Sequence, residues 1–320
     1  MSGKRPPSTP LRDIARESLA EPPARAALDR LPPLGSESVA FDLAGLSVVI
    51  EGLDPDLADA VGRRFQAYAC SPAGAISPLR VSAHADPIEY YVRPDLGERP
   101  EGYYRLRIVH EDGLIRLVAY SMAAWLDVEG RRGAIAFGTG DFDPRERAME
   151  NLVRVAVAWT AVSRGGFLIH GASIVRDGRG YIFFGKSASG KSTLCSLSTE
   201  GSVVSDDLSL VLPSAGGLVV AGTPFRGTFG AGDPKVGAWP LAGMFRLIQD
   251  DTTHVEEMPR VLAFAEYVAN LPFVNDALHA YPGLMERLEA AVRGVTIRSL
   301  HFTKSPDFWK AVDASLDGSA

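Results

Sequence analysis

Four residues between positions 185 and 192 have the types and the spacing of a phosphate-binding loop. Gly185, Gly190, Lys191 and Ser192 occupy every fixed position of the pattern G-x-x-x-x-G-K-[ST], and Thr193 follows. In such a loop the glycines let backbone amides wrap phosphate oxygens, the lysine contacts the outer phosphates, and the hydroxyl ligates magnesium. The predicted nucleotide-binding residues are Gly185, Lys186, Ser187, Ala188, Ser189, Gly190, Lys191, Ser192 and Thr193, with Ser192 also a metal ligand.

The residues on either side of the loop favour this interpretation, because a phosphate-binding loop leaves a buried strand and opens a helix. Residues 181–184 read Tyr-Ile-Phe-Phe, an apolar and β-prone run, and residues 191–197 can begin a helix. The alternative is a Ser/Gly-rich turn with an exposed lysine, since short motifs also arise by chance. With both flanks present, nucleotide binding is the stronger hypothesis.

Two carboxylates follow the loop closely, at Asp206 and Asp207. Residues 203–205 are typical of the next buried strand, and the end of that strand is where phosphate-loop folds hold magnesium. Adjacent residues of an extended strand point to opposite faces, so the pair can share a site only if the chain turns there. We expect Asp206 to ligate the metal and Asp207 to act as the base toward an acceptor hydroxyl; a simple polar turn is the alternative.

Two further polar side chains carry weaker signals. His170 ends a predicted strand over residues 167–170, a place where a lone histidine is more often structural than catalytic. Arg226 lies in the glycine-bounded loop 222–227, where it could stabilise transferring phosphate charge or be a solvated loop residue. No metal-ligand spacing is found for the other histidines, which are His84, His110, His254, His279 and His301.

Composition excludes several function classes. The 320 residues are 46% hydrophobic and 22% charged, as in soluble globular proteins, and the net charge of -6 offers no basic field for nucleic acid or anionic lipid. The only cysteines, Cys70 and Cys195, form neither a disulfide framework nor a zinc pattern, and we expect both to be buried and reduced. No run approaches the ~20 apolar residues of a membrane helix. We therefore expect a cytoplasmic protein without nucleic-acid or membrane partners.

The elements that position these residues divide the chain into four predicted parts. Residues 1–35 form a proline-rich helical arm, and residues 36–142 an α+β domain of hairpins with one helix after Asp54. Residues 143–164 form a connecting helix, and residues 165–320 an α/β domain around the phosphate loop. The fold class is therefore mixed, α+β followed by α/β.

Four segments, taken together, resemble the HPr kinase/phosphorylase family, and more closely its HPr-kinase-like relatives. They are residues 168–173, 185–193, 205–207 and 222–227, and the resemblance covers roughly residues 165–315. Order and spacing agree, with a histidine one hairpin before the loop and an aspartate pair soon after it. The resemblance implies a compact P-loop kinase domain similar to the nucleotide site of ATP-dependent phosphoenolpyruvate carboxykinase.

The same resemblance implies roles for individual residues. In such a kinase Lys191 binds phosphate, and Ser192 and Asp206 serve the magnesium ion. Asp207, assisted by His170, acts as the base toward a serine hydroxyl. One position departs from the family, because its Leu-Glu-Ile-Arg-Gly signature corresponds here to Thr-Pro-Phe-Arg-Gly at 223–227, without the acidic residue.

The expected function is that of an ATP- and magnesium-dependent kinase that phosphorylates a hydroxyl. The acceptor is a serine of a protein or peptide, or a small molecule, and HPr itself is not assumed. Two alternatives stay open: a nucleotide-responsive regulatory module without transfer, favoured by the missing acidic residue, and a carboxykinase acting on oxaloacetate. The oligomeric state is also open, a homo-oligomer included.

Overall fold

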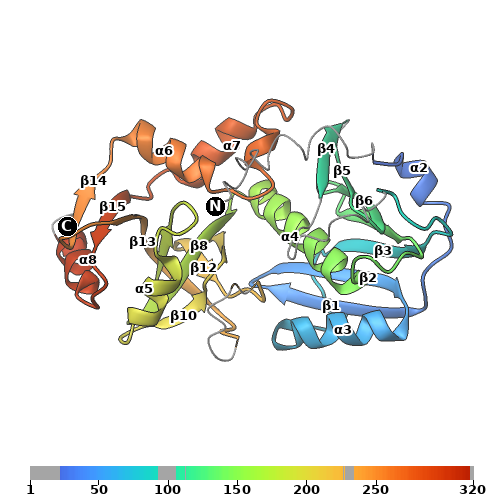
Figure 1. Cartoon of the computed structure of the whole chain (residues 1–320), viewed down its shortest axis with the longest axis horizontal. Helices are drawn as coiled ribbons and strands as arrows, with labels where there is room; N and C mark the ends of the chain where they lie inside the picture. Colours follow the sequence, from blue (N-terminus) through green and yellow to red (C-terminus); the bar gives the residue numbers. More distant parts are fainter. Residues whose placement is uncertain (1–21, 93–105, 112, 226, 228–233, 318–320) are drawn as a thin grey trace, which may run out of the picture. The chain divides into compact units, whose positions relative to one another are not determined.

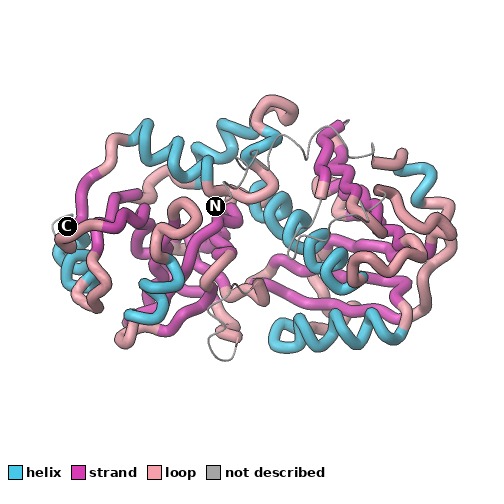
Figure 2. Tube along the Cα trace, in the orientation of Figure 1, coloured by secondary structure: helices cyan, strands magenta, loops and turns pink. Residues whose placement is uncertain are grey.

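The computed structural model of the chain describes residues 22–92, 106–111, 113–225, 227 and 234–317. These residues form a mixed α/β structure with two sheets and seven α-helices (Figures 1 and 2). The chain divides into two compact units, one made of residues up to 38, 50–61 and 80–152, the other of residues 39–49, 62–79 and 153 onward. Of the predicted N-terminal arm, residues 1–21 lie outside the described part, and the rest contains the short helix α2 (Arg25–Leu28).

The first sheet has seven strands in the order β1-β2-β3-β7-β6-β5-β4. Strand β3 pairs with β7 in parallel, whereas β7, β6, β5 and β4 form an antiparallel meander. Helix α3 (Pro55–Phe65) begins after Asp54, whose carboxylate accepts a hydrogen bond from the Leu57 amide at 2.8 Å. The strands are β1 (Glu37–Leu43), β2 (Leu46–Leu53), β3 (Leu79–Ala85), β4 (Arg107–Glu111), β5 (Leu114–Val118), β6 (Met122–Asp127) and β7 (Arg132–Phe137).

Helix α4 (Arg145–Ser163) agrees with the helix predicted after Asp143. Its apolar stripe, which includes Leu152, Val155 and Trp159, is buried, as the spacing of these residues predicts. Among the described helices, none is both long enough and apolar enough to cross a membrane.

The second sheet has eight strands in the order β10-β8-β11-β12-β13-β15-β14, and β9 pairs with both β8 and β13. The strand predicted over residues 167–170 does not end at His170 but continues to Arg176. β9, β13 and β15 run parallel to one another. The strands are β8 (Phe167–Arg176), β9 (Arg179–Phe184), β10 (Ser202–Ser205), β11 (Leu208–Ser214), β12 (Gly217–Ala221), β13 (Ala238–Gln249), β14 (His254–Glu257) and β15 (Ile297–Phe302).

An aromatic core fills the space beside these parallel strands. Phe183 of β9, Phe245 of β13 and Phe302 of β15 are buried together with Phe308 and Trp309 of the last helix. The C-terminal helix is thus docked by its apolar face. The remaining helices are α5 (Lys191–Leu197), α6 (Arg260–Ala269), α7 (Leu284–Ala291) and α8 (Phe308–Asp317).

The two cysteines differ in their surroundings. Both are free thiols. Cys195 is buried, and this burial raises the pKa of its thiol to about 12. Cys70 is only partly buried, so the expectation that both cysteines are buried is correct for Cys195 alone.

Gly190, at the end of the phosphate loop, lies against Phe302 of the aromatic core. We expect Gly190→Ala to destabilise the fold. Gly190 has φ +103°, and a Cβ atom would lie 2.6 Å from the ring of Phe302, which is buried. Gly178 has a positive φ of +72° but open space around it, so Gly178→Ala reports the backbone strain alone. We expect that strain to cost about 1–2 kcal/mol and the clash at Gly190 about 1–3 kcal/mol more in urea unfolding. Equal losses in both variants would show that no clash occurs.

Candidate phosphate-binding site

The site lies where three parallel strands end. The carboxyl ends of parallel strands meet at one edge of a sheet, which brings the segments after β9, β13 and β15 together. Residues 185–190 leave β9, Gln249 ends β13, and residues 303–304 follow β15. The Gln249 side-chain amide donates to the carbonyl of Ala188 at 2.8 Å. The end of β13 is therefore bonded to the phosphate loop.

The loop itself turns tightly between β9 and α5. Ala188 and Gly190 both have positive φ, and the amide of Ser189 donates to the carbonyl of Lys186 at 3.1 Å. The amide of Leu194 donates to the carbonyl of Gly190 at 2.8 Å and so closes the first turn of the helix. The predicted sequence of strand, loop and helix is present, with the glycine where a left-handed backbone is needed.

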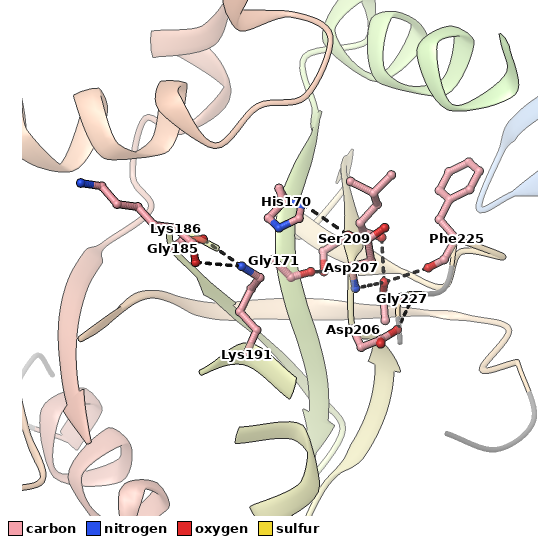
Figure 3. A network of polar contacts seen from close by, with 12 residues as sticks. His170, Gly171, Gly185, Lys186, Lys191, Asp206, Asp207, Ser209, Phe225 and Gly227 are labelled. Carbon is pink, nitrogen blue, oxygen red and sulfur yellow. Dashed lines mark hydrogen bonds and ion pairs between the residues drawn. The ribbon is translucent and has the colours of Figure 1, made fainter. Parts of the chain in front are cut away.

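The ammonium group of Lys191 is held inside the loop. Lys191 is 9% exposed, and its Nζ donates to the carbonyls of Gly185 at 2.9 Å and Lys186 at 3.3 Å (Figure 3). Burial lowers the pKa of Lys191, while the negative charge of Asp207 acts in the opposite direction. The Lys186 side chain is exposed and points away from Lys191 in Figure 3. Only one of the two loop lysines therefore places its charge in the site.

The two aspartates lie at a bend between β10 and β11. Both strands pair antiparallel with β8, and the Asp207 carbonyl accepts a hydrogen bond from the Gly171 amide at 2.9 Å. The Asp206 side chain accepts from the Gly227 amide at 2.8 Å (Figure 3). Asp206 is 9% exposed, so its carboxylate is held by the chain and not free in solvent. The bend allows both carboxylates to face one cavity, which an extended strand would not.

His170 lies on the neighbouring strand β8, directly across from Leu208. Its Nδ1 is 3.4 Å from a carboxylate oxygen of Asp207 (Figure 3). Burial lowers the pKa of His170, the positive charge of Lys191 lowers it further, and the Asp207 carboxylate raises it. His170 thus faces the site as a predominantly neutral imidazole near pH 7.

These opposing charges predict shifts that a histidine titration by NMR would measure. In Lys191→Met the cation is removed, so the pKa of His170 is expected to rise; in Asp207→Asn it is expected to fall. The exposed His279 serves as the internal reference signal. Because the pKa of His170 in the folded protein lies below its unfolded value of about 6.5, protonation favours the unfolded chain. His170 therefore lowers the free energy of unfolding as the pH falls from about 6.5 through the folded pKa. A fall of this pKa in Lys191→Met, or a rise in Asp207→Asn, would contradict the described arrangement.

The residues of the site line one cavity, whose volume of about 640 Å³ is within the range of ligand pockets. A smaller cavity of about 250 Å³ shares Gly190, Thr193, Gln249 and Lys304 with it and extends to Asp250 and Phe302. The lining of the larger one is His170, Ser187, Ala188, Gly190, Lys191, Ser192, Thr193, Asp206, Asp207, Gly227, Gln249 and Lys304.

Most of the residues proposed from the sequence therefore meet in one place. Gly185, Lys186 and Ser189 belong to the loop but do not line this cavity, and Arg226 lies outside the described residues. Sequence reasoning missed Gln249 and Lys304. Lys304 follows β15, whose alternating pattern is visible in the sequence, and could have been found as a cation at the carboxyl end of that strand. Gln249 lies on β13, a strand that was not predicted.

The comparisons with known proteins concern the segment that contains this site. Residues 143–270 match the model of a family described as SynChlorMet cassette protein ScmC. The match covers less than half of the chain and includes the loop, His170 and both aspartates. No curated protein matches.

This match corrects the resemblance inferred from the sequence motifs. The family found is ScmC and not HPr kinase/phosphorylase, so that assignment was wrong. The motifs that carried the resemblance are short, and any phosphate loop with nearby carboxylates requires similar residues. They are therefore weak evidence for one particular family. The missing acidic residue at 223–227 was the sequence signal against it.

Proposed function

We propose that this protein is an ATP- and magnesium-dependent phosphotransferase that transfers a phosphoryl group to a hydroxyl, with serine as the favoured acceptor. The observation that supports the proposal is the shared cavity, which Lys191, His170 and Asp207 all line and in which their charges act on one another. A buried cation beside a phosphate loop serves phosphate binding, and a carboxylate beside it serves proton removal. Phosphoryl transfer needs both.

The residues present fit a magnesium ion. Magnesium prefers hard oxygen ligands, and the Asp206 carboxylate and the Ser192 hydroxyl line the same cavity. Asp206 is held by the amide of Gly227, where a Cβ atom would lie 2.8 Å from the carboxylate. Glycine at 227 therefore allows the backbone to approach and orient that carboxylate. When bound, magnesium supplies positive charge to the phosphate oxygens.

The side chains of the chain itself then have separate tasks. Lys191 neutralises charge on the outer phosphates, and the loop amides of residues 185–190 orient them. Asp207 accepts the proton of the acceptor hydroxyl, which makes the hydroxyl oxygen a better nucleophile. His170, neutral and within 3.4 Å of Asp207, positions that carboxylate. The acceptor must reach the cavity from the side of Asp207.

Incubation of the full chain with γ-labelled ATP, magnesium and candidate acceptors tests the proposal. Serine-containing peptides, proteins and small hydroxyl compounds form the panel, and the expected result is acceptor-dependent transfer of label that stops when magnesium is chelated. Nucleotide binding without transfer to any acceptor would instead support a regulatory module whose partner affinity changes with nucleotide. Consumption of ATP only with oxaloacetate would support a carboxykinase.

A further inference from the structure

A cluster of two imidazoles and two carboxylates lies outside the phosphate site, at the edge of the second sheet. His254 of β14 and His301 of β15 are directly opposite each other in the antiparallel ladder, and their rings stack with centroids 4.4 Å apart. Asp250 follows the end of β13, bonded through its amide to the carbonyl of Phe302 at 3.2 Å. Glu256 is two residues beyond His254 and so on the same face of β14.

The polar atoms of this cluster converge. One ligand atom from each of Asp250, His254 and His301 can be chosen so that all three lie within 4.8 Å of one another. A tetrahedral ion with ligand distances of about 2.1 Å needs ligand atoms ~3.4 Å apart, so small side-chain rotations bring the three into place. His301 Nδ1 and the Asp250 carboxylate are now 2.7 Å apart in a hydrogen bond, which a bound ion would replace as the two atoms separate.

The remaining carboxylate supports the imidazoles. Glu256 lies 3.3 Å from Nε2 of His254 and 3.5 Å from Nε2 of His301. Metal-ligating histidines characteristically have such a carboxylate partner, which fixes the ring and raises its basicity. The two carboxylates also give the cluster the negative charge that attracts a dication.

We propose that Asp250, His254 and His301 bind a divalent transition metal of the zinc class, with Glu256 as the supporting carboxylate. Imidazole ligands favour zinc, cobalt, nickel or copper over magnesium, so this site is chemically distinct from the one at Ser192 and Asp206. The ion would tie β14 to the ends of β13 and β15. Asp250 also lines the smaller cavity, so the ion would stiffen a wall beside the phosphate loop.

Titration of the full chain with Co²⁺ tests this site, because tetrahedral cobalt absorbs visible light and zinc does not. One equivalent of Co²⁺ is expected to give a visible band that excess Mg²⁺ does not remove and that Zn²⁺ abolishes. His254→Ala and His301→Ala should each weaken Co²⁺ binding at least about 100-fold, the upper end of what the loss of a supporting partner costs. Glu256→Gln should weaken it about 10- to 100-fold.

Two controls separate this site from the rest of the chain. His279→Ala removes an exposed histidine from the turn before α7, and Asp206→Asn alters the proposed magnesium site. Both variants should still give the visible Co²⁺ band. Circular dichroism confirms that each variant is folded. Wild-type protein without the band, or equal loss in His279→Ala or Asp206→Asn, would overturn the proposal. The outcome does not depend on phosphotransfer, so it is distinguishable from the test of the proposed function.

Discussion

Lys191→Met is expected to weaken binding of magnesium-ATP by about 10- to 100-fold, the effect of losing a hydrogen bond to a charged group. The methionine keeps the length of the side chain but removes the ammonium that Gly185 and Lys186 hold with their carbonyls. Transfer should fall further, by about 10²- to 10³-fold, because the lysine stabilises charge that develops on the transferred group. Titration with a fluorescent ATP analogue measures the binding, and label transfer measures the rate.

Lys186→Ala is the matched comparison for this result. It removes the same charge from the same loop, but the Lys186 side chain is exposed and directed away from Lys191. The expected loss of ATP affinity is less than about tenfold, since solvent screens an exposed charge. If Lys186→Ala weakened ATP binding as much as Lys191→Met, the total charge of the loop would determine binding, and the position of the Lys191 ammonium would not matter.

Asp207→Asn is expected to reduce phosphoryl transfer by about 10²- to 10⁴-fold while magnesium-ATP still binds, since general-base catalysis contributes that much. Asparagine is nearly the same shape but cannot accept the proton of an acceptor hydroxyl. The half-buried Asp207 also meets His170, so the change keeps the polar contact while it removes the charge. Single-turnover measurements with bound nucleotide separate the chemical step from binding.

Two variants accompany this measurement. Asp206 is the proposed metal ligand, so Asp206→Asn should weaken the magnesium dependence of ATP binding. Asp206→Asn is thus expected to impair binding, whereas Asp207→Asn is expected to impair the chemical step. His170→Gln should lower the rate less than Asp207→Asn if the imidazole only positions the carboxylate. Full transfer activity in Asp207→Asn would exclude it as the base, and a larger loss in His170→Gln would assign that role to the imidazole.

Local signals in the sequence were sufficient for much of the fold. The helix after Asp143, the strand at 181–184 and the docked C-terminal helix each follow from spacing of apolar residues within one element. The loop 185–192 was identifiable because its fixed positions are contiguous. Such features depend on neighbours in the chain and so are visible without tertiary structure.

The central strand β13 was not predicted, and its sequence explains why. Ala238–Gln249 contains Pro240 and Gly243, which interrupt the apolar run, and its pairing with β9 has an irregularity between Leu241 and Gly243. Proline and glycine favour turns in isolation, and only pairing on both sides makes this segment a strand. Gln249 and the second cavity were missed with it.

The histidine cluster shows a second limit of sequence reasoning. His254 and His301 are far apart in the chain, and no short spacing rule connects them. They meet only because β14 and β15 pair in a register that places them directly opposite. Long-range register is a property of the assembled sheet, so no local pattern predicts it.

The bend at Asp206 and Asp207 has a consequence for how this chain can vary in length. Strands β10 and β11 are anchored to the same neighbour, with Ser205 across from Ser173 and Leu208 across from His170. If an inserted or deleted residue between the anchors shifted the register of one strand by one position, every side chain of that strand would turn to the wrong face. Natural insertions and deletions should therefore be rare in this link and concentrate in turns such as the one at Gly178, where nothing crowds the backbone.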